Sequence, residues 1–146
     1  MVTVGLPSLR LNHICRDLTT YGDQIQIECF KKYIRFSAED DLRFGDRPVH
    51  AHEKNGTVKP DDIVEIIVSE NVSFKPIKQS YSTMCFKNIA WSSAPSSRVT
   101  LQLGEDLPMM INFVLKSENQ ANSIENYLRF YVAPRITDDD DPSNSQ

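Results

Sequence analysis

Two residues near the amino terminus, His13 and Cys15, are of the types that could act as a base and a nucleophile. They stand two positions apart in a segment whose apolar spacing predicts a helix, and side chains at that spacing point in different directions. The chain contains no GxSxG, HExxH or P-loop sequence that would supply another catalytic arrangement. The sequence therefore predicts no catalytic residue, no cofactor and a protein that is not an enzyme.

Metal binding is a second chemistry to consider, because His50 and His52 alternate along a segment with strand character. Two histidines on one strand are too few ligands for a metal, and no further ligand is evident. The cysteines, Cys15, Cys29 and Cys85, form no CxxC pair, and their odd number excludes a complete disulfide framework. We therefore expect no metal site, three buried thiols and a reducing intracellular environment.

The net charge of -4 comes from residues 137–146, which contain Asp138, Asp139, Asp140 and Asp141 and no lysine or arginine. Residues 1–136 are therefore neutral overall, so binding to nucleic acid would depend on where individual cations lie. We expect one folded domain over residues 1–136 and a disordered acidic tail over residues 137–146. The longest apolar runs are far shorter than the roughly 18 residues of a membrane span, so no membrane partner is expected.

The elements that would position these side chains follow from the spacing of apolar residues. A first helix is expected from Ser8, as its N-cap, to a turn at Gly22. Its buried face would consist of Leu11, Ile14, Cys15 and Leu18. A second helix is expected over residues 77–91, with an apolar face of Tyr81, Met84, Cys85 and Ile89.

Alternating or continuous apolar residues predict strands in the rest of the chain. They are expected at residues 2–5, 24–29, 33–38, 49–52, 62–70, 98–103, 108–115 and 127–133. The charged segment 39–47 contains Gly45 and is expected to be a loop, as is segment 116–125, and Pro48 suggests an edge strand. Two helices with seven or eight strands predict the α+β class, with helices covering one face of a curved antiparallel sheet.

Several short motifs occur between about Leu6 and Ile136, and their order and spacing are informative about the family. They are Pro7-Ser8, residues 14–18, Gly22-Asp23, residues 36–38, residues 99–101, Leu107-Pro108 and residues 131–136. In order and spacing they resemble the C-terminal domain of the proliferating cell nuclear antigen family, the eukaryotic DNA sliding clamps. The resemblance implies a single sliding-clamp domain, with two helices packed on a curved antiparallel sheet. It also implies a nuclear, non-enzymatic processivity factor and scaffold of DNA replication and repair.

Rings of this family place helices around the DNA, so the resemblance implies a DNA-facing surface. On the first helix, His13 and Arg16 occupy the positions of two inward arginines, and Arg10 would add a third contact. On the second helix, Cys85 and Ser92 match basic positions. The nearest lysines there are Lys78 and Lys87, of which we expect Lys87 to face the DNA. We therefore expect a weakened basic face and weak binding of duplex DNA by the isolated chain. The alternative for Arg16 is a solvated residue or one paired with a neighbouring acid.

The resemblance also implies two surfaces for protein partners. A pocket for peptide motifs would be formed by Pro108, Tyr131, Ala133 and Pro134, together with parts of the family's clamps that lie outside the matched domain. The alternative for Tyr131 is core packing. The strand around residues 47–54, with Val49, His50 and His52, would pair with another clamp-fold chain or a second copy through sheet edges. Two functions stay open: a DNA clamp element, or a clamp-derived interaction subunit that no longer encircles DNA.

Overall fold

The computed structural model describes residues 1–53, 57–69, 73–91, 96–115 and 126–135. Their elements, in chain order, are β1 (Val2–Pro7), α1 (Ser8–Leu18), β2 (Gln24–Cys29), β3 (Tyr33–Glu39), β4 (Phe44–His50), the 3-10 helix η1 (Pro60–Asp62), β5 (Glu65–Val68), β6 (Ile77–Ser82), α2 (Thr83–Trp91), β7 (Arg98–Leu103), β8 (Met109–Leu115) and β9 (Asn126–Val132). This order repeats the unit β-α-β-β-β, from β1 to β4 and again from β6 to β9. The expected tail and the expected loop at residues 116–125 lie outside the described residues.

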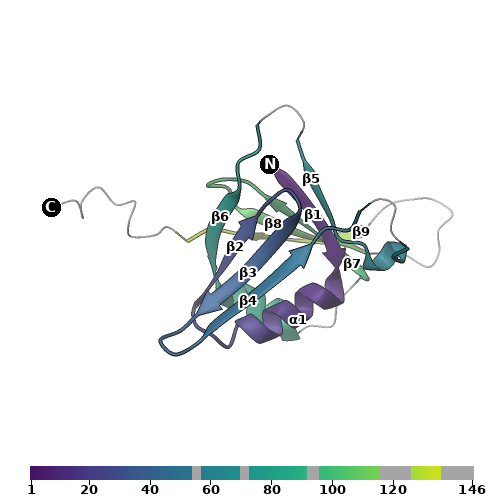
Figure 1. The fold of residues 1–146 in the computed structure, drawn as a ribbon. Coiled ribbons are helices and arrows are strands. Elements are labelled where there is room, and N and C mark those ends of the chain that lie inside the picture. Colours follow the sequence, from purple (N-terminus) through teal and green to yellow (C-terminus); the bar gives the residue numbers. More distant parts are fainter. Residues whose placement is uncertain (54–56, 70–72, 92–95, 116–125, 136–146) are drawn as a thin grey trace.

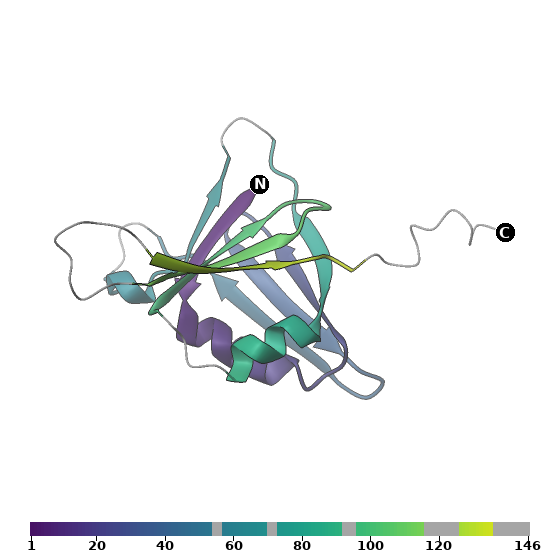
Figure 2. The ribbon, with the colours of Figure 1, turned by 180° about the vertical axis from the view of Figure 1, so that it is seen from behind.

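The strands of the described residues form two antiparallel sheets, where a single curved sheet was expected. Sheet A has the order β5-β1-β7-β8-β9, and sheet B has the order β4-β3-β2-β6. Each half of the chain gives its first strand to the sheet of the other half, because β1 pairs with β7 and β6 pairs with β2. Figure 1 shows sheet B in front, and Figure 2 shows sheet A from behind. The predicted α+β class is confirmed.

Both helices lie on the same side of the molecule, and Figure 2 shows them next to each other. The apolar face predicted for the first helix is confirmed, with Leu11, Ile14, Cys15 and Leu18 all buried. The Asn12 side-chain amide donates a hydrogen bond to the Ile89 carbonyl at 2.8 Å, which fixes α1 against α2. No helix in the described part of the chain has the length and apolar character that crossing a membrane requires.

The start of each helix is bonded to the segment that follows the other helix. The Ser8 N–H donates to the Ser97 carbonyl at 3.0 Å, and the Thr83 N–H donates to the Asp23 carbonyl at 3.0 Å. The predicted N-cap role of Ser8 is wrong, because Pro7 occupies the cap position and Ser8 is already helical. The Ser8 hydroxyl instead donates to the carbonyl of Ser96, so a tertiary partner replaces the local cap.

The second helix is shorter than the predicted range of residues 77–91. Its first six predicted residues form β6, which pairs with β2 from Gln24↔Ser82 to Cys29↔Ile77. The helix then starts at Thr83, and this changes which side chains face inward. Of the predicted apolar face, Tyr81 and Ile89 are buried, but Met84 and Cys85 are exposed, so the prediction is wrong for half of its residues. Thr83 and Phe86 are buried in their place. Pairing with β2 satisfies backbone groups along β6, and this tertiary contact outweighs local helix preference.

The predicted loop over residues 39–47 is also wrong, because β3 continues to Glu39 and β4 begins at Phe44. Gly45 indicated a loop but lies inside β4 for a packing reason. A Cβ atom there would come within 2.9 Å of the Leu18 side chain, so the glycine allows close approach to α1. Of the strand expected at residues 62–70, only Glu65–Val68 form a strand, β5, and the 3-10 helix η1 precedes it.

Because two thiols are buried, the free energy of unfolding is expected to fall at alkaline pH. Cys15 and Cys29 are buried as predicted, whereas Cys85 is exposed, which corrects the third expectation. Burial raises the pKa of Cys15 to about 12 and the pKa of Cys29 to about 11, from an ordinary value of 9.0. Above pH 9 these thiols ionise in the unfolded chain first. Stability is therefore complete below pH 9 and declines as pH rises through the folded pKa values.

We expect the free energy of unfolding to fall by about 1.4 kcal/mol per pH unit for each thiol between pH 9 and 11. Urea unfolding at pH 8, 9, 10 and 10.5 would measure the slope. The exposed Cys85 supplies the matched control, since Cys85→Ser should leave the slope unchanged and Cys29→Ala should reduce it. A slope that Cys29→Ala does not alter would contradict the assignment.

Candidate DNA-facing and partner-binding surfaces

The exposed side of the two helices carries the residues expected to face DNA. Arg10, His13 and Arg16 follow one another at intervals of three on α1, and all three are exposed. Lys87 is exposed on α2. Cations at this spacing on neighbouring helices could contact successive phosphates without reading base sequence. The structure therefore brings the four predicted DNA-facing residues to the exposed side of one helical layer.

The positive charge of this helical layer is limited. Cys85, at a position expected to be basic, is exposed on α2 and carries no cation, and Ser92 lies outside the described residues. Asp17 on α1 adds a carboxylate, which forms an ion pair with Arg47 of β4 at 3.4 Å. The described part of the layer thus presents three permanent cations, Arg10, Arg16 and Lys87, against one carboxylate.

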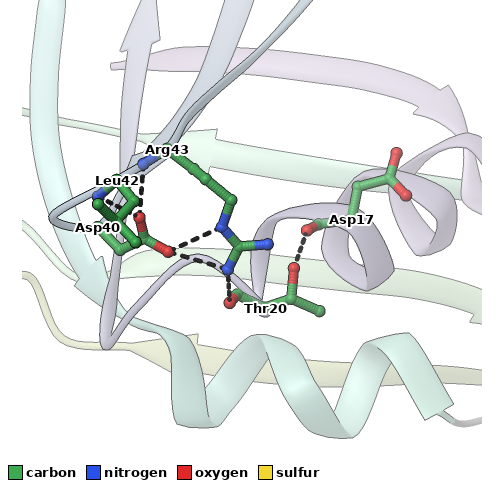
Figure 3. A network of polar contacts seen from close by, with 5 residues as sticks. All are labelled: Asp17, Thr20, Asp40, Leu42 and Arg43. Atoms are coloured by element: carbon green, nitrogen blue, oxygen red, sulfur yellow. Dashed lines mark hydrogen bonds and ion pairs between the residues drawn. The ribbon is translucent and has the colours of Figure 1, made fainter.

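A polar network that the sequence does not predict connects the turn between β3 and β4 to the segment after α1 (Figure 3). Asp40 Oδ1 accepts hydrogen bonds from the backbone N–H groups of Leu42 at 2.9 Å and Arg43 at 2.6 Å. Arg43 forms an ion pair with Asp40 at 2.9 Å and donates to the Thr20 carbonyl at 3.0 Å. Its guanidinium also lies 4.7 Å from the centre of the Tyr21 ring.

The bond from the Leu42 N–H, followed by the contacts of Arg43, lowers the pKa of the Asp40 carboxyl below its usual range. The network orders a turn whose Leu42 side chain is 94% exposed. The three-residue spacing of Asp40 and Arg43 around a short turn was the available signal in the sequence. This spacing does not stand out in the sequence, because the other charges around it are typical of a solvated loop.

The residues expected to form a peptide pocket gather where the two sheets meet. Tyr131 is in register with Met110 on sheet A, and the ladder ends at Met109↔Val132, which brings Pro108 next to Ala133. Pro134 forms a bridge to Tyr81 of β6, so the chain crosses to sheet B at this point. Tyr131 is 67% exposed, which excludes the alternative of core packing.

Two surface hollows lie elsewhere and do not include these four residues. One, of about 380 Å³, is bordered by the start of β1, the end of β5 and residues 73–77. The other, of about 200 Å³, lies over Gln24, Gln26, Ser37 and Ser80 on sheet B. The predicted peptide surface is therefore an exposed edge rather than either of these hollows.

The expected interface strand at residues 49–52 is shifted, because the structure places β4 at Phe44–His50. Val49 is 1% exposed and packs in the core, so its side chain does not meet a partner. His50 is exposed and its ring lies 5.4 Å from that of Tyr33. His52 lies beyond the strand, and its Nδ1 accepts a hydrogen bond from the Val64 N–H at 2.9 Å. The described residues contain no group of three or more potential metal ligands.

The last strand, β9, is the edge strand of sheet A at the end away from β5. It carries apolar side chains on both of its faces. Leu128 and Phe130 are 41% and 42% exposed although they alternate with the outward residues Tyr127 and Tyr131. An edge strand that exposes large apolar side chains on both faces is a typical contact surface for a further chain or domain.

Two β-α-β-β-β halves that exchange their first strands, with both helices on one side and open strands at the sheet ends, define a sliding-clamp domain. The sequence profile described as "Proliferating cell nuclear antigen, C-terminal domain" matches residues 1–135. The chain therefore belongs to the proliferating cell nuclear antigen family. It is 29% identical over 138 residues to the proliferating cell nuclear antigen of Chaetomium thermophilum. That match covers 94% of this chain and 48% of the relative, so the chain spans about half the length of this curated relative.

Proposed function

We propose that this domain is one segment of a ring-shaped clamp that acts with partner chains on duplex DNA in the nucleus. In this role it would tether polymerases and repair factors during DNA replication and repair, and it would carry out no reaction itself. Membership of the family supports the clamp, and the cations Arg10, Arg16 and Lys87 on the exposed helical layer support contact with phosphates.

The exposed apolar side chains of the edge strand β9 support the proposal that partner chains complete the ring. Tyr127 and Phe130 would stay in water in the isolated domain, and contact with a neighbouring clamp domain would bury them. Domains that join edge to edge extend a sheet around a ring while their helices remain on one side of it.

A topological assay tests the proposal. We expect the assembled ring to be retained on closed circular DNA through a salt wash and lost once the DNA is linearised, since only encirclement depends on free ends. Equal retention on circular and linear DNA would contradict a clamp role. The control is internal: the amount of ring retained on the same circular DNA is measured before and after a single restriction cut.

A second function is favoured by the weak charge of the helical layer, namely a clamp-derived interaction subunit that no longer encircles DNA. His13 and Cys85 are both exposed where a strongly cationic surface would be expected to carry arginine or lysine. This function predicts stable complexes with other proteins and little affinity for DNA. Micromolar, salt-dependent binding of DNA by the isolated chain would count against it.

The proposed peptide-docking role makes a prediction for Tyr131. In the assembled clamp, Tyr131→Ala is expected to weaken binding of a labelled docking peptide from a clamp-binding protein by about tenfold or more, because an exposed tyrosine at an anchor site is a typical hot spot. Leu42→Ala, in the exposed turn between β3 and β4, is the control and should bind normally. Fluorescence anisotropy would measure both variants, and equal losses would contradict an anchor role for Tyr131.

A further inference from the structure

The segment after β9 extends sheet B beyond its edge strand β6. Pro134 forms an antiparallel bridge to Tyr81, and the Arg135 N–H donates to the Ser80 carbonyl at 2.7 Å. Figure 2 shows the segment that continues β9 reaching β6. Because the bridge is antiparallel, the chain at Arg135 is directed along β6 toward the start of that strand, and away from helix α2, which follows its end.

The free edge of β6 offers one further pair of backbone groups in this direction. Since the Ser80 carbonyl faces Arg135, alternate residues of β6 face the free edge, and the residues between them bond to β2. Lys78 is the next residue that faces the edge, and Thr137 would be its partner in a continued ladder. Sheet B ends at β6 in the described part of the chain, so no strand there pairs with the Lys78 backbone. Pro76 has no N–H, so a ladder would end after this pair.

Exposed lysines gather at the end of β6 to which this direction leads. Lys78 is exposed on β6, and Lys75 is exposed just before the strand. Lys31, in the turn between β2 and β3, has its Nζ 5.9 Å from the centre of the Phe74 ring. We call Lys31, Lys75 and Lys78 the lysine cluster. Among the described residues, no carboxylate forms an ion pair with any of them, and even with Glu28 in register with Lys78 the cluster keeps a positive charge.

The sequence after Arg135 carries the opposite charge at a matching distance. Residues 138–141 are four consecutive aspartates. In an extended chain they would lie roughly 10–20 Å beyond Arg135, at about 3.3 Å per residue. The way along β6 from Ser80 to Lys75 covers a similar length, about 17 Å. The hollow of about 380 Å³ bordered by residues 73–77 lies at this end of β6 and leaves room for an added segment.

We propose that the acidic segment 136–141 adds an antiparallel strand to the free edge of β6 in the same molecule and places its aspartates against the lysine cluster. Opposite charges on neighbouring strands stabilise such pairing. The docked segment closes an open strand edge and covers a cationic surface from other polyanions. The cations of the helical layer fit this segment less well, because the chain at Arg135 is directed away from α2. This inference goes beyond the proposed clamp function and does not depend on it.

Amide hydrogen exchange of the full chain, followed by NMR at low ionic strength, tests the docking residue by residue. Replacing all four aspartates by asparagine is expected to speed exchange of the Lys78 N–H about tenfold or more, because the edge hydrogen bond and the charge pairs are lost together. High salt should have the same effect on the unchanged chain. The Gln79 N–H is the internal reference, since it bonds to β2 and should keep its rate.

A control variant removes the same charge from other elements. It neutralises four exposed acids through Asp41→Asn, Glu53→Gln, Asp61→Asn and Asp62→Asn. This variant should leave the exchange rate of the Lys78 N–H unchanged. Equal acceleration in both variants would mean that net charge governs the exchange, and the docking proposal would be wrong.

Charge reversal tests the contact with the lysine cluster itself and keeps Lys78 as the reporter. Lys31→Glu with Lys75→Glu should speed exchange of the Lys78 N–H as the tail substitutions do. Adding Asp140→Lys with Asp141→Lys should restore slow exchange, because opposite charges then face each other again. If exchange stayed fast in the fourfold variant, the aspartates would not contact this cluster.

Two other outcomes would identify a different occupant or a different site, and each would overturn the proposal. Protection of the Lys78 N–H that rises with protein concentration would show that the tail of a second copy binds the edge. Tail substitutions that shift the amide resonances of α1 and α2 but not that of Lys78 would place the tail on the helical layer. Failure of the clamp function is distinguishable, because absent retention on circular DNA would leave the protection of Lys78 as it is.

Discussion

Replacement of Phe36 by alanine is expected to lower the free energy of unfolding by about 3–5 kcal/mol, the usual cost of removing a large side chain from a packed core. Phe36 is 1% exposed and lies on β3, in register with Ile27 of β2. Helix α1 packs against this strand, so the cavity would also loosen the support of the helix that carries Arg10 and Arg16. Urea unfolding followed by circular dichroism would measure the change.

The matched control is Phe44→Ala on the neighbouring strand β4. Phe44 is 58% exposed, so the same deletion should cost less than about 1 kcal/mol. If both variants lost similar stability, the core would not be centred between β3 and the helices as described. A loss at Phe36 that left the transition slope unchanged would confirm a simple loss of packing.

The second large effect concerns DNA. The double change His13→Arg and Cys85→Lys adds two permanent cations to the exposed helical layer, next to Arg10, Arg16 and Lys87. Each new phosphate contact should steepen the plot of log affinity against log salt by about 0.9. We therefore expect the salt slope to increase by about 1.8 and duplex binding at low salt to strengthen roughly tenfold. Fluorescence anisotropy with a labelled duplex across a salt series measures both quantities.

The control places the same charge on the other side of the domain. Thr100→Lys with Gln102→Lys adds two cations to the outer face of β7, where these residues alternate with buried Val99 and Leu101. This variant should leave the salt slope close to that of the unchanged chain. If both double variants bound DNA equally well, net charge rather than the helical layer would govern binding, and the assignment of the DNA-facing side would be wrong.

Elements whose burial pattern is local in the sequence were predicted well. The helical spacing of Leu11, Ile14 and Leu18 indicated both α1 and its buried face, and alternation indicated the hairpin of β2 and β3. Elements defined by distant partners were predicted poorly. Ile77–Ser82 has a spacing compatible with a helix, and only its pairing with β2 makes it a strand. In the same way, Gly45 indicates a turn until the packing of Leu18 against it is known.

The candidate surfaces show the same division. The family resemblance predicted that His13 and Arg16 face the DNA, with Arg10 as a third contact, and the structure exposes all three side chains on α1. The position of Cys85 relative to the core could not be predicted, because a shift of the helix start to Thr83 rotates every later residue about the axis.

By itself, the sequence determined the family, the α+β class and the side chains that α1 exposes, because each depends on residue order or on spacing within one element. Only the tertiary structure decided which backbone groups face the free edge of a sheet. Lys78 is an ordinary polar residue in the sequence. Its backbone groups face the free edge of sheet B once the pairing of β6 with β2 and with the segment after β9 is known. The direction of an N–H group in a sheet depends on the register with another strand, and that register is set by long-range packing.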